Sequence, residues 1–384
     1  MKIPYGKQTI DKEDVLAVIG VLESDFLTTG PKVKEFEESF AAAVGAKYAV
    51  AVSSGTAALH LACMAIGLKE SDEVITSPMT FVASSNCVLY CNAKPVFVDI
   101  TKNGLIDNEK IEEKITSKTK AIIPVHYSGL ICDMSEINRV AKKHKLYVIE
   151  DACHALGAKY ENSKAGDCEY SDLAIFSFHP VKHITTAEGG MITTNSKQLY
   201  EKLLMLRTHG ITRDQNKLIK NNPEPWYYEM QELGYNYRIT DVQCALGASQ
   251  LKKLPKFIEL RRDIAKKYNS FFKDLKDITI LKEKENQFNS YHLYLIKVKN
   301  EETRLKLFNY LHEKGIFCQV HYIPVYWQPY YKKIGYSVGI CPNAEEFYKR
   351  IISLPIYPGL TREEQEYVID KIREFIIKSQ KNTI

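Results

Sequence analysis

The chain has 384 residues, of which 45% are apolar and 26% charged, so it is long enough for two domains and can bury a large core. Its 52 basic and 47 acidic residues are mixed along the chain and leave a net charge of only +5, which argues against a nucleic-acid partner. Nine cysteines without a Cys-x-x-Cys pair, and an N-terminus without the apolar core of a signal peptide, predict a reducing cytoplasmic location.

The first two-thirds of the chain alternates short strand-like runs with helical segments. The uncharged stretch 48–68 is interrupted by Ser-Ser-Gly-Thr, so a strand, a turn and a buried helix explain it better than a membrane span. The alternation of strand-like and helical segments predicts an α/β layer with a mostly parallel sheet that helices cover on both faces. The expected strands are 47–52, 73–76, 94–99, 120–125, 146–150 and 173–178, and the expected helices are 56–67, 80–92, 134–144 and 198–208.

The pattern changes after residue 210. The polar segment 211–226, with two prolines near its end, is expected to be an exposed loop, and a long helix at about 238–275 should break at Pro255. We therefore expect a large α/β domain over residues 1–250, including the N-terminal segment, and a smaller C-terminal α+β domain over 251–384. The elements expected in the smaller domain are strands at 291–298 and 316–322 and helices at 302–314 and 362–377.

A candidate anion site follows the first of the expected buried strands. Ser53-Ser54-Gly55-Thr56 begins a helix, where free N–H groups attract an anion and the glycine permits close backbone approach. An ordinary helix N-cap has the same pattern, so the segment alone predicts either. It is not a Walker A loop, because no Gly-Lys-Ser/Thr follows.

A carboxylate lies at the end of a later strand, in Glu150-Asp151-Ala152-Cys153-His154. A buried charge needs a partner, and the protonated nitrogen of a pyridine ring would be one. An aspartate that caps the next helix is the other interpretation of Asp151. His154 would contact the same ligand or be an ordinary core histidine.

A lysine follows the strand expected at 173–178. Lys182 stands just beyond that buried strand and before Gly189-Gly190, a setting that favours a lowered pKa. An ordinary surface lysine is the other interpretation of Lys182. An uncharged lysine amine can form an imine with a carbonyl compound. Because ligands bind at the carboxyl ends of parallel strands, the order of anion site, acid and lysine fits an enzyme that uses pyridoxal 5′-phosphate (PLP).

Four motifs together resemble the fold-type I PLP-dependent nucleotide-sugar aminotransferases, over nearly the whole chain. They are Ser-Ser-Gly-Thr-Ala-Ala-Leu, Glu-Asp-Ala-Cys-His-Ala-Leu-Gly, Ser-Phe-His-Pro-Val-Lys with the following Thr-Thr-Ala-Glu-Gly-Gly, and Gly-Tyr-Asn-Tyr-Arg-Ile-Thr-Asp. Segments 225–238, 291–294 and 319–326 are similar to the C4 transaminases of pseudaminic acid biosynthesis. That likeness implies transfer of an amino group from L-glutamate to a UDP-linked 4-keto-6-deoxy N-acetyl hexosamine, giving UDP-4-amino-4,6-dideoxy-N-acetyl-β-L-altrosamine.

The resemblance also implies roles for individual residues. Lys182 would hold PLP as a Schiff base and carry protons, Asp151 would pair with the pyridine nitrogen, and His154 would lie near the ring hydroxyl. Asn236 would reach the cofactor phosphate of the neighbouring subunit, so a homodimer is implied. The other expected cofactor contacts are Gly55, Thr56 and Ser177 at the phosphate and Phe81 stacked on the ring; the expected substrate contacts are Tyr5, Asp25, Phe26, Leu27, Thr28, Arg238, Gln319, Val320, His321 and Tyr322.

Three alternatives compete with this interpretation. A C4 aminotransferase for a D-configured UDP-4-keto sugar, of the bacillosamine or 4-amino-arabinose type, would share every motif, and a non-catalytic sensor of PLP or sugar nucleotide would need no reactive lysine. An NAD-dependent enzyme would require Gly-x-Gly-x-x-Gly after an early strand, and the sequence has none.

Overall fold

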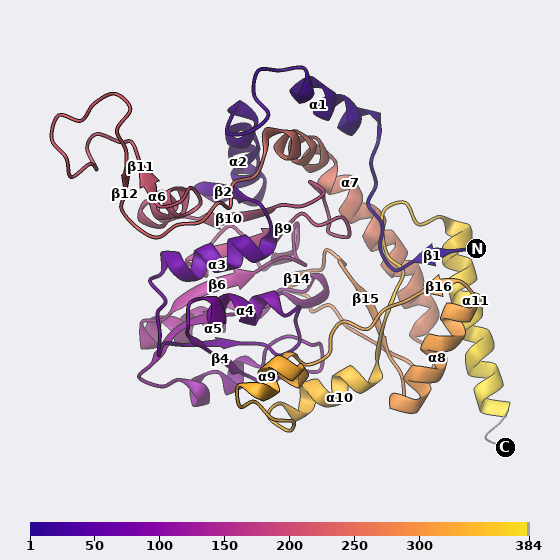
Figure 1. Ribbon diagram of the computed structural model, residues 1–384. Coiled ribbons are helices and arrows are strands. Elements are labelled where there is room, and N and C mark those ends of the chain that lie inside the picture. Colours follow the sequence, from indigo (N-terminus) through magenta and orange to yellow (C-terminus); the bar gives the residue numbers. More distant parts are fainter. Residues whose placement is uncertain (382–384) are drawn as a thin grey trace.

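The computed structural model describes residues 1–381, and its centre is a seven-stranded sheet (Figure 1). The strand order is β2-β10-β9-β6-β5-β3-β4; β10 is antiparallel to both of its neighbours, and every other adjacent pair is parallel. The expected mostly parallel sheet is confirmed. Its strands are β2 (Tyr48–Val52), β3 (Glu73–Thr76), β4 (Lys94–Phe97), β5 (Thr119–Ile123), β6 (Tyr147–Asp151), β9 (Leu173–Ser177) and β10 (Gly190–Thr194).

Helices cover both faces of this sheet, as the near-continuous apolar character of its strands predicts. Alternate residues of β2 point to opposite faces of the sheet. Val50 and Val52 pack with one group of helices, and Ala49 and Ala51 pack with the other. One group is α3 (Gly55–Ala65), α4 (Ala83–Tyr90) and α6 (Lys197–Leu206); the other includes α2 (Pro31–Val44), α5 (Met134–His144) and part of α7 (Asp241–Phe272).

Two expectations about this region are wrong. No strand was expected at 190–194, yet β10 lies between β2 and β9 and is buried throughout. Helix α7 also continues through Pro255 without a break. Pro255 is exposed, so its ring and its missing N–H disturb only the solvent side of a helix whose other side is packed into the core.

The C-terminal part is built around a small antiparallel sheet. Its order is β13-β15-β17, and it packs with α8, α11 and the second half of α7 around a separate apolar cluster. Its elements are β13 (Thr279–Ile280), β15 (Tyr294–Lys297), β16 (Ile316–Phe317), β17 (Ile351–Leu354), α8 (Glu301–Glu313), α9 (Pro329–Lys333), α10 (Pro342–Arg350) and α11 (Arg362–Lys381). The boundary expected at residues 250–251 falls inside α7, and it stays a prediction.

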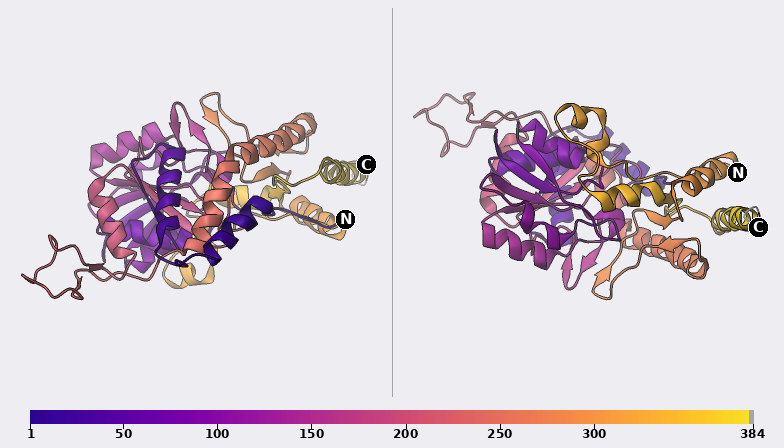
Figure 2. Two further views of the ribbon diagram at one scale, coloured as in Figure 1. Left: turned by 90° about the horizontal axis from the view of Figure 1, so that it is seen from above. Right: turned by 90° about the horizontal axis from the view of Figure 1, so that it is seen from below.

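The N-terminal segment and a hairpin extend from this framework. Strand β1 (Ile3–Pro4) pairs with β16, so the chain starts beside the C-terminal sheet before α1 (Lys12–Leu22) crosses α7. Segment 211–226, expected to be a loop, begins with β11 (Ile211–Thr212), which pairs with β12 (Glu229–Met230); the connecting residues project away from the body (Figure 2). A further small sheet joins β14 (Gln287–Phe288), β7 (Lys159–Tyr160) and β8 (Ser163–Lys164). None of the helices in the described part of the chain has both the length and the apolar character needed to cross a membrane.

Candidate active site

A cavity of about 450 Å³ lies where the parallel strands of the large sheet end. Its wall takes residues that directly follow β2, β3, β5, β6 and β9, which is where open α/β sheets bind ligands. Ten of the residues expected from the sequence line it: Tyr5, Gly55, Thr56, Phe81, Asp151, His154, Ser177, Lys182, His321 and Tyr322.

The expected anion site is the N-terminus of α3. Ser54 caps this helix, because its hydroxyl accepts a hydrogen bond from the N–H of Ala57 (3.0 Å). Gly55 and Thr56 belong to the first turn, whose N–H groups have no partner within a helix. A Cβ atom on Gly55 would lie 2.8 Å from the Cβ of Ser177, so the glycine lets the end of β9 approach the helix. The site is therefore a narrow cradle of N–H groups, lined by the hydroxyl-bearing residues Thr56 and Ser177.

Asp151 is the last residue of β6 and is buried at the cavity wall. Its carboxylate accepts hydrogen bonds from the hydroxyl of Ser84 (2.5 Å) and from the N–H of Cys153 (3.2 Å). It forms no salt bridge among residues 1–381, so a cation in the cavity would supply the positively charged partner that this carboxylate lacks.

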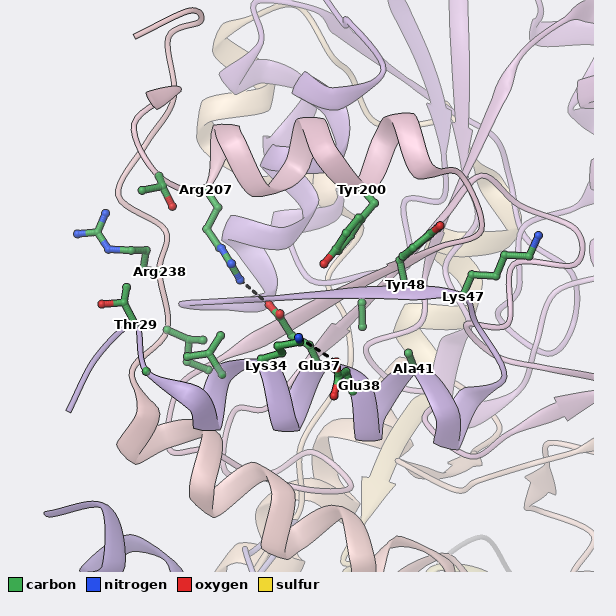
Figure 3. Close-up of a pocket in the computed structure, with 15 residues that line it drawn as sticks. Thr29, Lys34, Glu37, Glu38, Ala41, Lys47, Tyr48, Tyr200, Arg207 and Arg238 are labelled. Carbon is green, nitrogen blue, oxygen red and sulfur yellow. Dashed lines mark hydrogen bonds and ion pairs between the residues drawn. The ribbon is translucent and has the colours of Figure 1, made fainter. Parts of the chain in front are cut away.

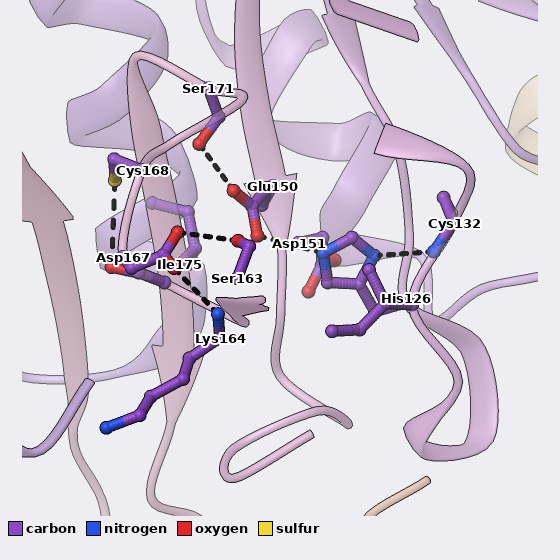
Figure 4. Close-up of polar contacts among 12 residues, drawn as sticks. His126, Cys132, Glu150, Asp151, Ser163, Lys164, Asp167, Cys168, Ser171 and Ile175 are labelled. Atoms are coloured by element: carbon purple, nitrogen blue, oxygen red, sulfur yellow. Dashed lines mark hydrogen bonds and ion pairs between the residues drawn. The ribbon is translucent and has the colours of Figure 1, made fainter. Parts of the chain in front are cut away.

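A second polar network lies behind Asp151 (Figure 4). Glu150 accepts a hydrogen bond from Ser171 (2.5 Å) and lies 2.9 Å from the Nε2 atom of His126. The backbone N–H of His126 in turn donates to the carbonyl of Asp151 (3.0 Å). These contacts hold the end of β6 in place, and they point Glu150 away from the cavity, which it does not line.

Lys182 lies in the turn that follows β9 and lines the same cavity. Burial lowers the pKa of its ammonium group, and the nearby Cys153 and Asp151 oppose that shift. A lysine with a lowered pKa is a better nucleophile near neutral pH, because more of it is uncharged.

Histidines and a tyrosine form the floor of the cavity. The Nε2 atom of His154 lies 3.1 Å from the hydroxyl of Tyr322, and its ring centre lies 4.2 Å from that of His292. Burial, followed by the charge of Lys182, holds the pKa of His154 well below its usual value, so this ring is neutral. Its Nδ1 atom is buried and unpaired in the described chain, a free hydrogen-bonding position next to the cavity.

The N-terminal segment meets the segment around His321 at the cavity wall. The rings of Tyr5 and His321 have centres 5.1 Å apart, and the Nδ1 atom of His321 lies 2.8 Å from the hydroxyl of Ser353. Phe81, 58% exposed, faces Tyr322 with ring centres 6.4 Å apart. An aromatic surface is thus available to a planar ligand.

The remaining expected residues do not line this cavity. Gln319 pairs with Ser353 in an isolated bridge, and Val320 packs against the core. The segment 25–28 is exposed and Thr28 bridges to Thr240, near the exposed Asn236. Arg238 lies in a different cavity of about 520 Å³ between α2, β2 and α6 (Figure 3). That second cavity contains the ion pair of Glu37 and Arg207 (2.5 Å) but neither Lys182 nor Asp151.

Several residues of the cavity wall were not expected from the sequence. Ser84, which holds Asp151, comes from α4 and is 67 positions away in the chain, so no local pattern marks it. His179 and Glu188 stand inside the lysine motif but had no role assigned, and His292 stands inside the segment 291–294.

The wall suits PLP in its donors and its charges. An N–H cradle fits a phosphate, the unpaired carboxylate of Asp151 fits a protonated pyridine nitrogen, and the free Nδ1 atom of His154 offers a further polar contact. Lys182 lines the same cavity and carries an amine of the kind that a PLP enzyme requires. The fold and the cavity define a PLP enzyme of fold-type I.

Comparisons with known proteins agree. The model of the DegT/DnrJ/EryC1/StrS aminotransferase family matches residues 8–373. The UDP-4-amino-4,6-dideoxy-N-acetyl-beta-L-altrosamine transaminase of Campylobacter jejuni serotype O:23/36 is 40% identical over 384 residues, which cover 99% of each chain. The spore coat polysaccharide biosynthesis protein SpsC of Bacillus subtilis is 40% identical over 380 residues, 97% of each chain.

Two solved structures are also similar. PseC of Helicobacter pylori, an aminotransferase of pseudaminic acid biosynthesis, has a TM-score of 0.91 and 34% identity, covering 98% of this chain and 99% of that one. The PLP form of the sugar aminotransferase Spr1654 from Streptococcus pneumoniae has a TM-score of 0.91 and 31% identity, with the same coverage. The chain therefore belongs to the DegT/DnrJ/EryC1/StrS aminotransferase family. It is a PLP-dependent sugar aminotransferase, which favours the enzyme over the sensor considered above.

Proposed function

We propose that this enzyme transfers the amino group of L-glutamate to C4 of a UDP-linked 4-keto-6-deoxy N-acetyl hexosamine. The product would be UDP-4-amino-4,6-dideoxy-N-acetyl-β-L-altrosamine, an intermediate for pseudaminic acid. The observation that carries the proposal is the 40% identity, over the whole chain, to the Campylobacter jejuni transaminase of that name.

The wall of the cavity supports a division of work among its residues. Gly55, Thr56 and Ser177 would hold the cofactor phosphate, and Phe81 would cover one face of the ring. Asp151 would accept a charged hydrogen bond from the pyridine nitrogen, which keeps that nitrogen protonated. The remaining proposed cofactor contact is His154, through its free Nδ1 atom at the ring hydroxyl.

When bound, PLP supplies a reactive aldehyde on a ring that withdraws electrons. The proposed task of Lys182 is to hold the cofactor between turnovers and then to move protons at its Nζ atom. Released as a free amine, Nζ would take a proton from the α-carbon of glutamate and, in the second half of the cycle, deliver one to C4 of the sugar. Its lowered pKa suits this role, because an uncharged amine can accept the proton.

His321 and Tyr322 would offer uncharged side chains to both substrates of the cavity. Burial lowers the pKa of His321 to about 4, with a further contribution from the charge of Lys182, and burial raises the pKa of Tyr322. Both side chains are therefore uncharged hydrogen-bonding groups at neutral pH. They and Tyr5 would contact the sugar nucleotide.

The surface that carries Asn236 supports a homodimer. Segment 25–28 bridges to Thr240, and Arg238 follows Asn236, so these expected site residues share one exposed surface although they do not line the cavity of their own chain. The adjoining hairpin exposes large apolar side chains, including Ile219 (85%) and Trp226 (77%). Exposed apolar side chains of this size are typical of an interface, and a second copy would place this surface at the neighbouring cavity.

Mixed dimers test this arrangement. A heterodimer of a Lys182→Ala chain and an Asn236→Ala chain, purified through two different tags, should keep one intact site and about half of the wild-type activity at limiting PLP. The matched control puts both substitutions in one chain and pairs it with a wild-type chain. That control should be nearly inactive, because neither site then has both residues. Equal activity of the two heterodimers would show that Asn236 does not act across the interface.

The sugar is tested directly. The B. subtilis relative is as similar as the C. jejuni one and its name states no sugar, so the configuration needs an assay of its own. Incubation with L-glutamate and UDP-linked 4-keto sugars of L-arabino and D-xylo configuration should give amino sugar, detected by mass spectrometry, with a preference for the L-arabino substrate. Preference for the D-xylo sugar would replace the proposal with the bacillosamine-type alternative.

A further inference from the structure

Glu188 is a cavity residue that the proposed mechanism does not use. Glu188 and Asp151 carry the two carboxylates that line the cavity among the described residues. Asp151 is buried and doubly hydrogen-bonded, whereas Glu188 is exposed to the cavity and its carboxylate has no partner among residues 1–381. An unpaired carboxylate at the wall is available to a ligand.

The backbone around Glu188 is held firmly. Its carbonyl accepts hydrogen bonds from the hydroxyl of Thr186 (2.7 Å) and from the side-chain amide of Gln243 (2.6 Å). Ala187 has a φ of 65°, in the left-handed region that non-glycine residues rarely adopt, and its N–H donates to the hydroxyl of Thr185 (3.0 Å). A Cβ atom on Gly189 would lie 2.2 Å from the hydroxyl oxygen of Thr186, so the next position must be glycine. These contacts give the backbone of Glu188 a defined place.

The turn of Glu188 is connected to a segment that is proposed to contact the sugar nucleotide. Gln243, which holds the turn, belongs to the first turn of α7, and Thr240 caps that helix. Thr240 also bridges to Thr28, in the segment 25–28 that is proposed to contact a sugar nucleotide in the neighbouring site. Glu188 is thus connected through the start of α7 to the proposed dimer surface, and it lines the same cavity as Lys182.

We infer that the carboxylate of Glu188 recognises the sugar ring of the nucleotide substrate, by accepting a hydrogen bond from a hydroxyl or amide N–H of that sugar. This inference rests on the proposed function and names one residue that separates the two substrates. The sugar ring offers neutral donors to a carboxylate. The amino donor brings two carboxylates, which Glu188 repels, so it weakens the binding of glutamate. One side chain thus favours the bulky substrate over the small one in a shared site.

Binding measurements test the inference without catalysis. The PLP-loaded wild type, Glu188→Gln and Glu188→Ala are titrated by calorimetry with UDP-N-acetylglucosamine, UDP-glucose and UDP alone. Glu346→Gln is the matched control, because Glu346 lies on the exposed side of α10 and, among the residues that the structure describes, pairs only with Lys349, at 3.8 Å. Loss of a hydrogen bond to a charged group weakens binding by about 10- to 100-fold. We expect a loss of this size for the sugar nucleotides with Glu188→Ala, unchanged UDP binding, and wild-type values for Glu346→Gln.

The pattern of losses identifies the donor. Weaker binding of UDP-N-acetylglucosamine alone assigns the contact to the acetamido N–H, and equal weakening of both sugar nucleotides assigns it to a ring hydroxyl; either result supports the inference. Unchanged binding of both, or an equal loss for UDP alone, would overturn it while leaving the proposed function intact. A wild type that binds none of the three ligands would overturn the proposed function and the inference together. In single-turnover assays, Glu188→Ala should slow the sugar half-reaction but not the glutamate half-reaction.

Discussion

The hydroxyl of Ser84 allows a sharp test of how Asp151 holds the cofactor. Ser84→Ala removes the 2.5 Å hydrogen bond to the Asp151 carboxylate and leaves only the N–H of Cys153. A hydrogen bond to a charged group is worth about 1.5–3 kcal/mol, which corresponds to a loss of about 10- to 100-fold in affinity if the whole effect appears in binding. We expect PLP to bind more weakly by this factor, measured by absorbance as the apoprotein is titrated with PLP.

Ser85 provides the matched control. It is the next residue of α4, is fully buried, and its hydroxyl lies 2.7 Å from that of Tyr331, not near Asp151. Ser85→Ala therefore removes the same atoms and a buried hydrogen bond of about 1 kcal/mol, so it should lower the free energy of unfolding in urea by about that amount. Only Ser84→Ala should lose PLP affinity. Equal PLP affinity in the two variants would refute the idea that Ser84 orients the carboxylate for the cofactor.

Two predictions concern stability. The pKa of His321 falls from 6.5 to about 4 on folding, because the ring is buried and near Lys182. As the pH drops, the unfolded chain therefore binds the proton first. The free energy of unfolding should fall between about pH 6.5 and about pH 4 and be unaffected by this group above that range. In urea titrations across that range His321→Asn should show a shallower fall, and an unchanged slope would contradict the assignment. Pro255→Ala restores an N–H to an exposed interior position of α7 and should raise the free energy of unfolding by about 1–3 kcal/mol in the same assay, whereas a decrease would mean that the proline contributes a contact or a rigidity absent from this account.

Much of the architecture was predictable because buried strands and helices leave a local record. The strands expected at 73–76 and 173–178 became β3 and β9 with ends displaced by at most one residue, since apolar, β-branched runs between turn residues have few other uses. Strand β10 was missed because it directly follows Gly189 and begins with Gly190, which belongs to the lysine motif. The continuity of α7 through Pro255 was missed because it depends on packing along the other side of the helix.

The site divides in the same way. The sequence by itself determined the reactive groups: the order of cradle, acid and lysine along the chain led to PLP, because each stands at the carboxyl end of a strand and those ends meet at one edge of the sheet. Only the tertiary structure decided which side chains support them. Ser84 reaches Asp151, Tyr322 reaches His154, and Glu188 is held by Gln243, all through contacts between segments that are dozens of residues apart. A local pattern records a strand or a turn, but a hydrogen bond between distant segments exists only once the chain has folded, and so the support of this site could be read from the structure alone.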